Sequence, residues 1–324
     1  MGEAMSVDRR HFLLAGGAVA GGGFASAAYA AAAAVPARSV TDFGVDPNST
    51  ADQTKALQKA IDELSAAGQP LILPAGIYRA GKLALPLICS IVGVPGHTSL
   101  LLDEADTGPR AAAGSFHLFG VDFVPRASKT ASAQLTIRGA RVRISNCAFQ
   151  GTGGTAVILE GCSGSVEAVS VSGYSDSGVA VTSSGLTISG CSFRSCGTGV
   201  KAVSSESTIV SQNQFDQCGT GIGADGVGIV SGNIVRDAKN FGLKLGRADG
   251  KGRIVAQGNL LENCGVGIGV TASGDDIFAS LNLIHGAKNG AIRAFDGDKL
   301  VGRDLARESA EMYLNLTVAG NVAR

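Results

Sequence analysis

Short apolar stretches separated by glycine-rich turns recur along the second half of the chain. The segments at 188–203, 210–224, 230–245, 255–270 and 278–294 align with one another, and an earlier unit at 144–159 aligns with them. Each unit holds several glycines and lacks the long 3.6-residue periodicity of a helix, which predicts short strands. A recurrence of about 22 residues predicts an all-β solenoid in which each unit forms one coil.

The alignment also predicts which side chains stack on one another in successive coils. Two inward columns are expected to form the core: Phe149, Phe193, Phe215, Val235, Leu261 and Ile284 in one, and Val157, Val200, Ile222, Leu243, Ile268 and Ile292 in the other. A third column continues from Cys191 through Asn213, Asn233, Asn259 and Asn282. Stacked asparagines predict a ladder in which each amide bonds to its neighbours above and below.

Two more columns carry structural expectations. Four equivalent glycines, Gly199, Gly221, Gly242 and Gly267, are predicted to turn a corner with positive φ. An outward column alternates in charge: Gln150, Arg194, Asp216, Arg236, Glu262 and His285. Opposite charges on adjacent strands attract, so this column is predicted to fix the stacking register.

Residues 40–78 differ from the repeats. Ser49 or Thr50 is expected to cap a helix with Asp52 in its first turn. The helix has an apolar face, a glycine follows it, and a short buried strand precedes a Pro-Ala-Gly turn.

Several short motifs of this segment point to a known family. They are Asp42-Phe43-Gly44-Val45, Asp52, Thr54, Ala60-Ile61 and Pro74-Ala75-Gly76-Ile77-Tyr78. The segment resembles the opening of pectate-lyase-like (pectin-lyase-like) right-handed β-helix proteins. The resemblance implies a single-stranded right-handed parallel β-helix with an N-terminal capping helix that shields the open end of the first coil.

The first thirty residues have the order of an export signal. Arg9 and Arg10 precede an apolar Gly/Ala-rich run that ends in Ala28-Tyr29-Ala30. This resembles a twin-arginine motif. The alternative is a transmembrane anchor, but the glycines make the run only mildly apolar, which argues against it. The expected organisation is a signal peptide at 1–30, a linker at 31–38, the cap helix and first coils at 39–134, and repeats at 135–324. We therefore expect a periplasmic or extracellular protein without a permanent membrane span.

Together, the signal, the opening segment and the coils resemble a family of uncharacterised twin-arginine-translocated repeat proteins. The resemblance implies the twin-arginine translocase and a signal peptidase as partners during export. The chain ends at 316–324 in what looks like the start of another coil, which predicts either a truncated gene or a homo-oligomer contact that covers the last coil.

Composition narrows the class of protein. The chain has 47 Gly in 324 residues and no Trp, and 27 basic residues balance 27 acidic ones. The high apolar content excludes simple disorder, and the absence of a glycine at every third position excludes collagen. The charge balance argues against a nucleic-acid partner.

The candidate ligand-binding residues lie on one outward column, and the candidate catalytic residues are a few acids and a histidine. Lys201, Gly223, Lys244, Gly269 and Arg293 are expected to alternate cations with bare backbone, which suits an anionic chain. The alternative is a solvated surface strip. The candidate catalytic acids are Asp225, Asp237, Asp249, Asp275 and Asp276. Asp275, Asp276 and His285 are the predicted catalytic residues, although Asp275-Asp276 also fits a loop pair and His285 fits the charge ladder.

The seven cysteines are compatible with three states. They are Cys89, Cys147, Cys162, Cys191, Cys196, Cys218 and Cys264. The alternatives are buried free thiols, a disulfide between Cys196 and Cys218 on adjacent coils, and a metal or cofactor site. The superfamily resemblance adds calcium, which its polysaccharide lyases hold with clustered aspartates.

The function expected from these features is binding, with or without processing, of an acidic polysaccharide. If the protein is an enzyme, the resemblance implies a polysaccharide lyase, an epimerase or a glycoside hydrolase, but the motifs of the hydrolases and of the alginate epimerases are not reproduced. The alternatives are a non-catalytic envelope scaffold and a cofactor-binding twin-arginine substrate.

Overall fold

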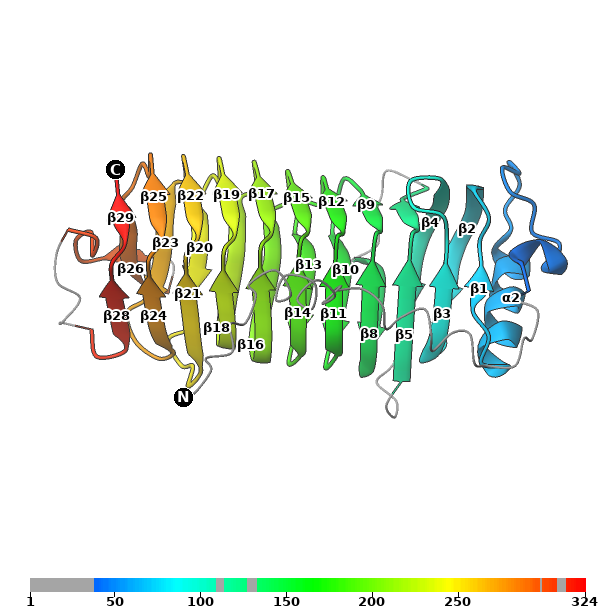
Figure 1. Ribbon diagram of the computed structural model, residues 1–324, viewed down its shortest axis with the longest axis horizontal. Helices are drawn as coiled ribbons and strands as arrows, with labels where there is room; N and C mark the ends of the chain where they lie inside the picture. Colours follow the sequence, from blue (N-terminus) through cyan, green and yellow to red (C-terminus); the bar gives the residue numbers. More distant parts are fainter. Residues whose placement is uncertain (1–37, 109–113, 127–132, 298, 308–312) are drawn as a thin grey trace, which may run out of the picture. The chain divides into compact units, whose positions relative to one another are not determined.

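The computed structural model describes residues 38–108, 114–126, 133–297, 299–307 and 313–324. From residue 38 onward these residues form one compact unit. It is a parallel β-solenoid whose coils contribute strands to three stacks, and each strand pairs in register with its equivalents in the next coils. Figure 1 shows the strands side by side along the solenoid, with α2 at the N-terminal end and β28 and β29 at the other. The predicted fold is confirmed.

The first stack extends from the N-terminal coil to the C-terminal coil. Its members are β1 (Leu71–Ile72), β3 (Ile88–Val92), β5 (Gly114–Phe119), β8 (Ala140–Ser145), β11 (Ser163–Glu167), β14 (Gly185–Ser189), the ends of β16 (Thr198–Ser211) and β18 (Thr220–Ser231), β21 (Arg253–Gln257), β24 (Asp276–Ser280) and β28 (Leu316–Ala319).

The second stack consists mostly of three-residue strands. It begins with the first halves of β2 (Gly76–Ala84) and β4 (Thr98–Asp106) and continues through β6 (Asp122–Val124), β9 (Ala148–Gln150), β12 (Ser170–Ser172), β15 (Ser192–Arg194), β17 (Gln214–Asp216), β19 (Ile234–Arg236), β22 (Leu260–Glu262), β25 (Leu283–His285) and β29 (Val322–Ala323).

The third stack carries the candidate ligand column. It begins with the ends of β2 and β4 and continues through β7 (Ala133–Arg138), β10 (Thr155–Glu160), β13 (Ser177–Thr182), the starts of β16 and β18, β20 (Phe241–Leu245), β23 (Val266–Thr271) and β26 (Ile292–Asp296). The strand β27 (Lys299–Val301) pairs antiparallel with β26.

A short 3-10 helix η1 (Val40–Phe43) and the α-helix α2 (Thr54–Ala66) precede the coils. The apolar face of α2 is buried through Leu57, Ala60, Ile61 and Leu64. The cap prediction was wrong, because the helix begins later than expected and its N-cap is Gln53. Asp52 lies just outside the helix and accepts a hydrogen bond from the Thr54 backbone at 2.9 Å.

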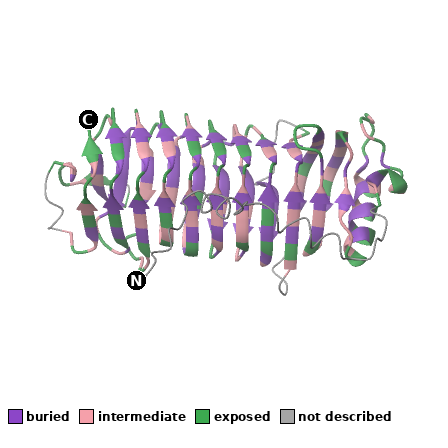
Figure 2. Cartoon of the chain, viewed as in Figure 1, coloured by how far each residue is buried: buried purple, intermediate pink, exposed green. Residues whose placement is uncertain are grey.

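Both predicted core columns are confirmed. Every residue named for them is at most 1% exposed, and their registers agree with the strand pairing. Stacked neighbours of the same kind lie close, as in the Phe193–Phe215 pair, whose ring centroids are 4.9 Å apart. Figure 2 shows buried and exposed positions alternating along the strands, which is the pattern that a strand with one core-facing side requires.

The asparagine ladder is also confirmed, and it continues to Asn321. In each step the side-chain carbonyl of the later Asn accepts from the backbone and from the amide of the earlier one, at 2.9–3.0 Å. Each amide also donates to a backbone carbonyl, such as Val230 O from Asn259 at 2.9 Å. Because these side chains are buried, each bond replaces one that water would otherwise supply.

The charged outward column has the predicted register. Ser172 lies between Gln150 and Arg194. Arg194 pairs with Asp216 at 3.2 Å, and Arg236 pairs with Glu262 at 2.7 Å. These exposed pairs favour the correct register but contribute little to stability.

The corner glycines have a different cause from the one predicted. Gly199, Gly221, Gly242 and Gly267 do not have positive φ. Instead, a Cβ on Gly199 would lie 2.3 Å from the Phe215 ring and 2.7 Å from the carbonyl oxygen of Gly221. The close approach of the next coil, rather than backbone conformation, therefore excludes a side chain at these positions.

Replacing Asn259 by Ala should lower the free energy of unfolding by about 3 kcal/mol or more, because it leaves buried partners of the ladder without hydrogen bonds on both sides. Chemical denaturation measures the change. The control is Gln257→Ala, since Gln257 is exposed at the end of β21, two residues before Asn259. Equal stability of the two variants would contradict a stabilising role for the ladder.

Candidate functional site

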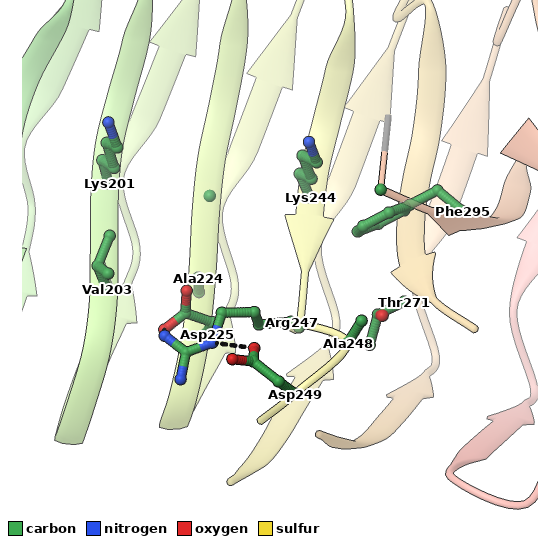
Figure 3. Close-up of a pocket in the computed structure, with 14 residues that line it drawn as sticks. Lys201, Val203, Ala224, Asp225, Lys244, Arg247, Ala248, Asp249, Thr271 and Phe295 are labelled. Carbon is green, nitrogen blue, oxygen red and sulfur yellow. Dashed lines mark hydrogen bonds and ion pairs between the residues drawn. The ribbon is translucent and has the colours of Figure 1, made fainter. Parts of the chain in front are cut away.

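A groove of about 420 Å³ lies on the outward side of the third stack. Its floor is formed by β16, β18 and β20, and Lys201, Gly223 and Lys244 occupy equivalent positions on these three strands. Figure 3 shows the two lysine side chains on either side of the strand that carries Ala224, with a cluster of charged side chains at one end of the groove.

Gly223 leaves bare backbone between the two cations. A Cβ there would meet only Thr198, at 3.9 Å, so the space above this residue is open. Lys201 is exposed. Adjacent coils are about 4.8 Å apart, so the Cα atoms of Lys201 and Lys244 are separated by roughly 10 Å. The arrangement allows an anionic group to approach the backbone between two ammonium groups.

Lys244 lies beside two aromatic rings. Its Nζ is 5.6 Å from the ring centroid of Phe241 and 5.0 Å from that of Phe295. Cation–π attraction at these distances limits the orientations of the ammonium group. The Phe295 ring also lines the groove and gives this side an apolar wall.

The remainder of the predicted cationic column is closed to a ligand. A Cβ on Gly269 would lie 2.7 Å from the Phe241 ring, so that ring covers the backbone here. The guanidinium of Arg293 donates to the carbonyl oxygens of Asn289 and Gly302 at 2.9 and 3.0 Å. The five residues share one column, as expected, but the open part is limited to Lys201, Gly223 and Lys244.

Asp225, Arg247 and Asp249 form the charged cluster at the end of the groove. Arg247 Nε donates to Asp249 at 2.7 Å, and its Nη1 lies 3.9 Å from Asp225. Burial raises the pKa of the Asp225 carboxyl, although the Ser204 N–H and the Arg247 charge act in the opposite direction. The Asp225 side chain is 17% exposed and that of Asp249 is 82% exposed. The two acids offer hydrogen-bond acceptors to hydroxyl groups of a ligand.

Asp275 has a structural role in place of the predicted catalytic one. Its side chain is fully buried and accepts hydrogen bonds from three backbone N–H groups, those of Arg247 at 3.0 Å, Gly252 at 2.7 Å and Gly226 at 3.3 Å. It therefore holds the loop 246–252, which carries Arg247 and Asp249, against the groove.

Asp276 and His285 lie on other faces of the solenoid. Asp276 is on β24 of the first stack, 63% exposed, with a carboxylate oxygen 4.0 Å from Arg253. His285 is exposed on β25 of the second stack, where it pairs in register with Glu262. The structure thus brings together Lys201 and Lys244 but does not bring the three predicted catalytic residues to one place.

Arg247, Phe241 and Phe295 were not identified from the sequence. A usable signal exists for the aromatic residues, because each interrupts a column of smaller residues. Phe241 follows Ser177, Thr198 and Thr220, and Phe295 follows Thr271. For Arg247 the signal is weaker, since it lies in a loop outside the repeat.

No group of three or more His, Cys, Asp or Glu side chains within the described residues is placed to hold a metal ion. The calcium site implied by the resemblance therefore does not fit this part of the chain.

No helix among the described residues is both long and apolar enough to cross a bilayer. Arg9 and Arg10, the predicted signal motif, lie outside the described residues.

Replacing Asp275 by Ala should lower the free energy of unfolding by about 3 kcal/mol and open the loop 246–252, because three buried N–H groups lose their acceptor. Denaturation measures the first effect, and faster tryptic cleavage after Arg247 and Lys251 measures the second. Asp276→Ala is the matched control and should behave like the unmodified protein. If both variants were equally stable, the structural role of Asp275 would be refuted.

Two family models match the chain. Residues 134–284 match the right handed beta helix region, and residues 37–105 match rhamnogalacturonase A/epimerase, pectate lyase-like. No curated protein matches. Tailspike proteins of Escherichia coli bacteriophage HK620 are among the similar solved structures.

A tailspike mutant in complex with a pentasaccharide is 14% identical, with a TM-score of 0.61, over 79% of this chain and 59% of that one. A mutant with a hexasaccharide is 13% identical, with a TM-score of 0.59, over 87% and 64%. The chain thus spans about three fifths of the tailspike length, and at these identities the likeness concerns the fold. The narrower resemblance to twin-arginine-translocated repeat proteins stays a prediction. The family matches and the coil geometry together identify the fold of this chain as a right-handed parallel β-helix, whose N-terminal segment is similar to the rhamnogalacturonase A/epimerase, pectate lyase-like family.

Proposed function

We propose that the protein binds a short acidic saccharide in the groove between Lys201 and Lys244. The observation that carries this proposal is the bare backbone of Gly223 between two ammonium groups on neighbouring coils. A carboxylate or sulfate can enter there and contact both cations, while a neutral sugar gains nothing from them.

The surroundings of the lysines favour a saccharide over a simple anion. Asp225 and Asp249 provide acceptors for hydroxyl groups at one end, and Phe295 provides an apolar wall at the other. A groove of about 420 Å³ is within the size range of small-molecule sites. Because Phe241 covers Gly269, the open cationic floor spans two coil spacings, which favours a short acidic segment over a long polymer track.

The saccharide-bound tailspike mutants support the proposal only through their fold.

The location of the protein is a second proposal. We propose export by the twin-arginine pathway to the periplasm, on the basis of Arg9 and Arg10 before an apolar run. Whether the bound saccharide is also cleaved is decided by incubation with galacturonate polymers, followed by measurement of new reducing ends and of unsaturated products.

Lys201→Ala and Lys244→Ala should each weaken binding of galacturonate oligomers by about tenfold, because a charge-assisted hydrogen bond contributes roughly 1.5 kcal/mol. Isothermal titration calorimetry measures the affinity, and added salt should weaken it by screening the cations. Neutral galactose oligomers of the same length are the ligand control. Equal affinity for acidic and neutral oligomers would exclude the proposed role of the lysines.

Gly223→Leu should abolish binding without loss of stability, because the new side chain enters the groove and its Cβ meets no atom closer than Thr198, at 3.9 Å. The matched control is Gly185→Leu on the first stack, where a Cβ would be 3.7 Å from the nearest atom, the Ser207 oxygen. Both variants should unfold at the same denaturant concentration as the unmodified protein. Retained affinity in Gly223→Leu would place the ligand elsewhere.

A further inference from the structure

Cys196 and Cys218 are the one pair of cysteines that occupies equivalent positions in consecutive coils. Each follows by two residues a strand position that pairs in register, Arg194 with Asp216. All seven cysteines lie within the described residues, and all are buried free thiols. In the other columns a different residue separates the cysteines: Ala238 lies between Cys218 and Cys264, and Val169 lies between Cys147 and Cys191.

The backbone around this pair has the spacing that a disulfide needs. Gly219 N donates to Cys196 O at 2.8 Å, which holds the two coils in register directly beside the cysteines. Neighbouring strands are about 4.8 Å apart, and disulfides join Cα atoms about 4.4–6.8 Å apart.

The side chain of Cys218 also points toward the coil of its partner. The Sγ of Cys196 lies 3.5 Å from Arg194 O of its own coil. The Sγ of Cys218 lies 3.9 Å from Phe193 O, so it reaches toward the coil that carries Cys196.

A surface hollow gives an oxidant a route to the pair. It has a volume of about 530 Å³ and is lined by Cys196 together with Gln217, Asp237 and Lys239. Cys196 is 2% exposed, whereas Cys218 is fully buried and does not line the hollow. This order suits a two-step exchange in which Cys196 reacts first and Cys218 second.

We propose that Cys196 and Cys218 are a redox modification site that forms a disulfide between consecutive coils. With glutathione disulfide as oxidant, the Cys196 thiolate attacks one glutathione sulfur and the other glutathione leaves as a thiolate. The Cys218 thiolate then attacks the Cys196 sulfur of the mixed disulfide, and the second glutathione leaves. Both protein thiols are oxidised, one glutathione disulfide is reduced, and the two protons pass to the released glutathione thiolates.

The cross-link would connect the two coils that open the groove. Cys196 precedes Lys201 by five residues, and Cys218 precedes Gly223 by five residues. The link therefore fixes the spacing of the two coils from which these groove residues extend. Formation of the disulfide does not depend on the proposed function.

The test uses the full chain in glutathione buffers of increasing oxidation, followed by acid quenching, alkylation in denaturant and tryptic digestion. Trypsin cleaves after Arg194, Lys201 and Arg236, so each cysteine falls in its own peptide, 195–201 and 202–236. The expected result is loss of two of the seven alkylated thiols and appearance of these two peptides as one disulfide-linked species. The oxidised protein should also unfold at higher temperature than the reduced protein.

Two variants and a refolding arm complete the test. Cys264→Ala should keep the linked species, and Cys218→Ala should lose it. Refolding the denatured chain in the same buffers removes any limit set by access to the buried thiols. Seven alkylated thiols in both the native and the refolded samples, or a linked species that contains another pair of cysteines, would overturn the proposal.

Discussion

In-register stacking of each coil on the previous one is the constraint on which the structure depends. Backbone hydrogen bonds between parallel strands repeat at every coil, and the ladder asparagines from Asn213 to Asn321 extend the same repeat into the side chains. A slip of one residue would place the core-facing side chains in water and leave buried amides without partners. The ladder therefore supplies specificity of register, to which the exposed ion pairs add little.

This constraint explains why so much of the fold was predictable. Once Asn213, Asn233 and Asn259 are aligned, every other residue of those coils is assigned to a column, and alternation decides which columns face inward. Both core columns, the charged column and the placement of Lys201 beside Gly223 and Lys244 follow from this alignment. These predictions needed only the knowledge of which residues occupy equivalent positions in successive coils, and the repeats in the sequence show that.

Features that depend on contacts between unlike positions could not be predicted. The corner glycines are needed because the next coil approaches closely, which the alignment does not measure. Likewise, the sequence does not show that the Phe241 ring covers Gly269. Asp275 and Asp276 are adjacent in sequence, yet one is buried beneath a loop and the other faces solvent, because their roles are decided by where that loop folds.

The groove lies beside an irregularity of the repeat. From Asn213 to Asn282 the successive ladder asparagines are 20, 26 and 23 residues apart, and the longest of these three intervals, between Asn233 and Asn259, contains the loop 246–252. The additional residues cannot join a stack, so they form the loop that places Arg247 and Asp249 over the groove, and buried Asp275 holds it there. In a solenoid whose register is fixed by stacking, such an insertion adds charged side chains to one face without disturbing the core. The candidate site is therefore where a regular cationic column meets an irregular loop.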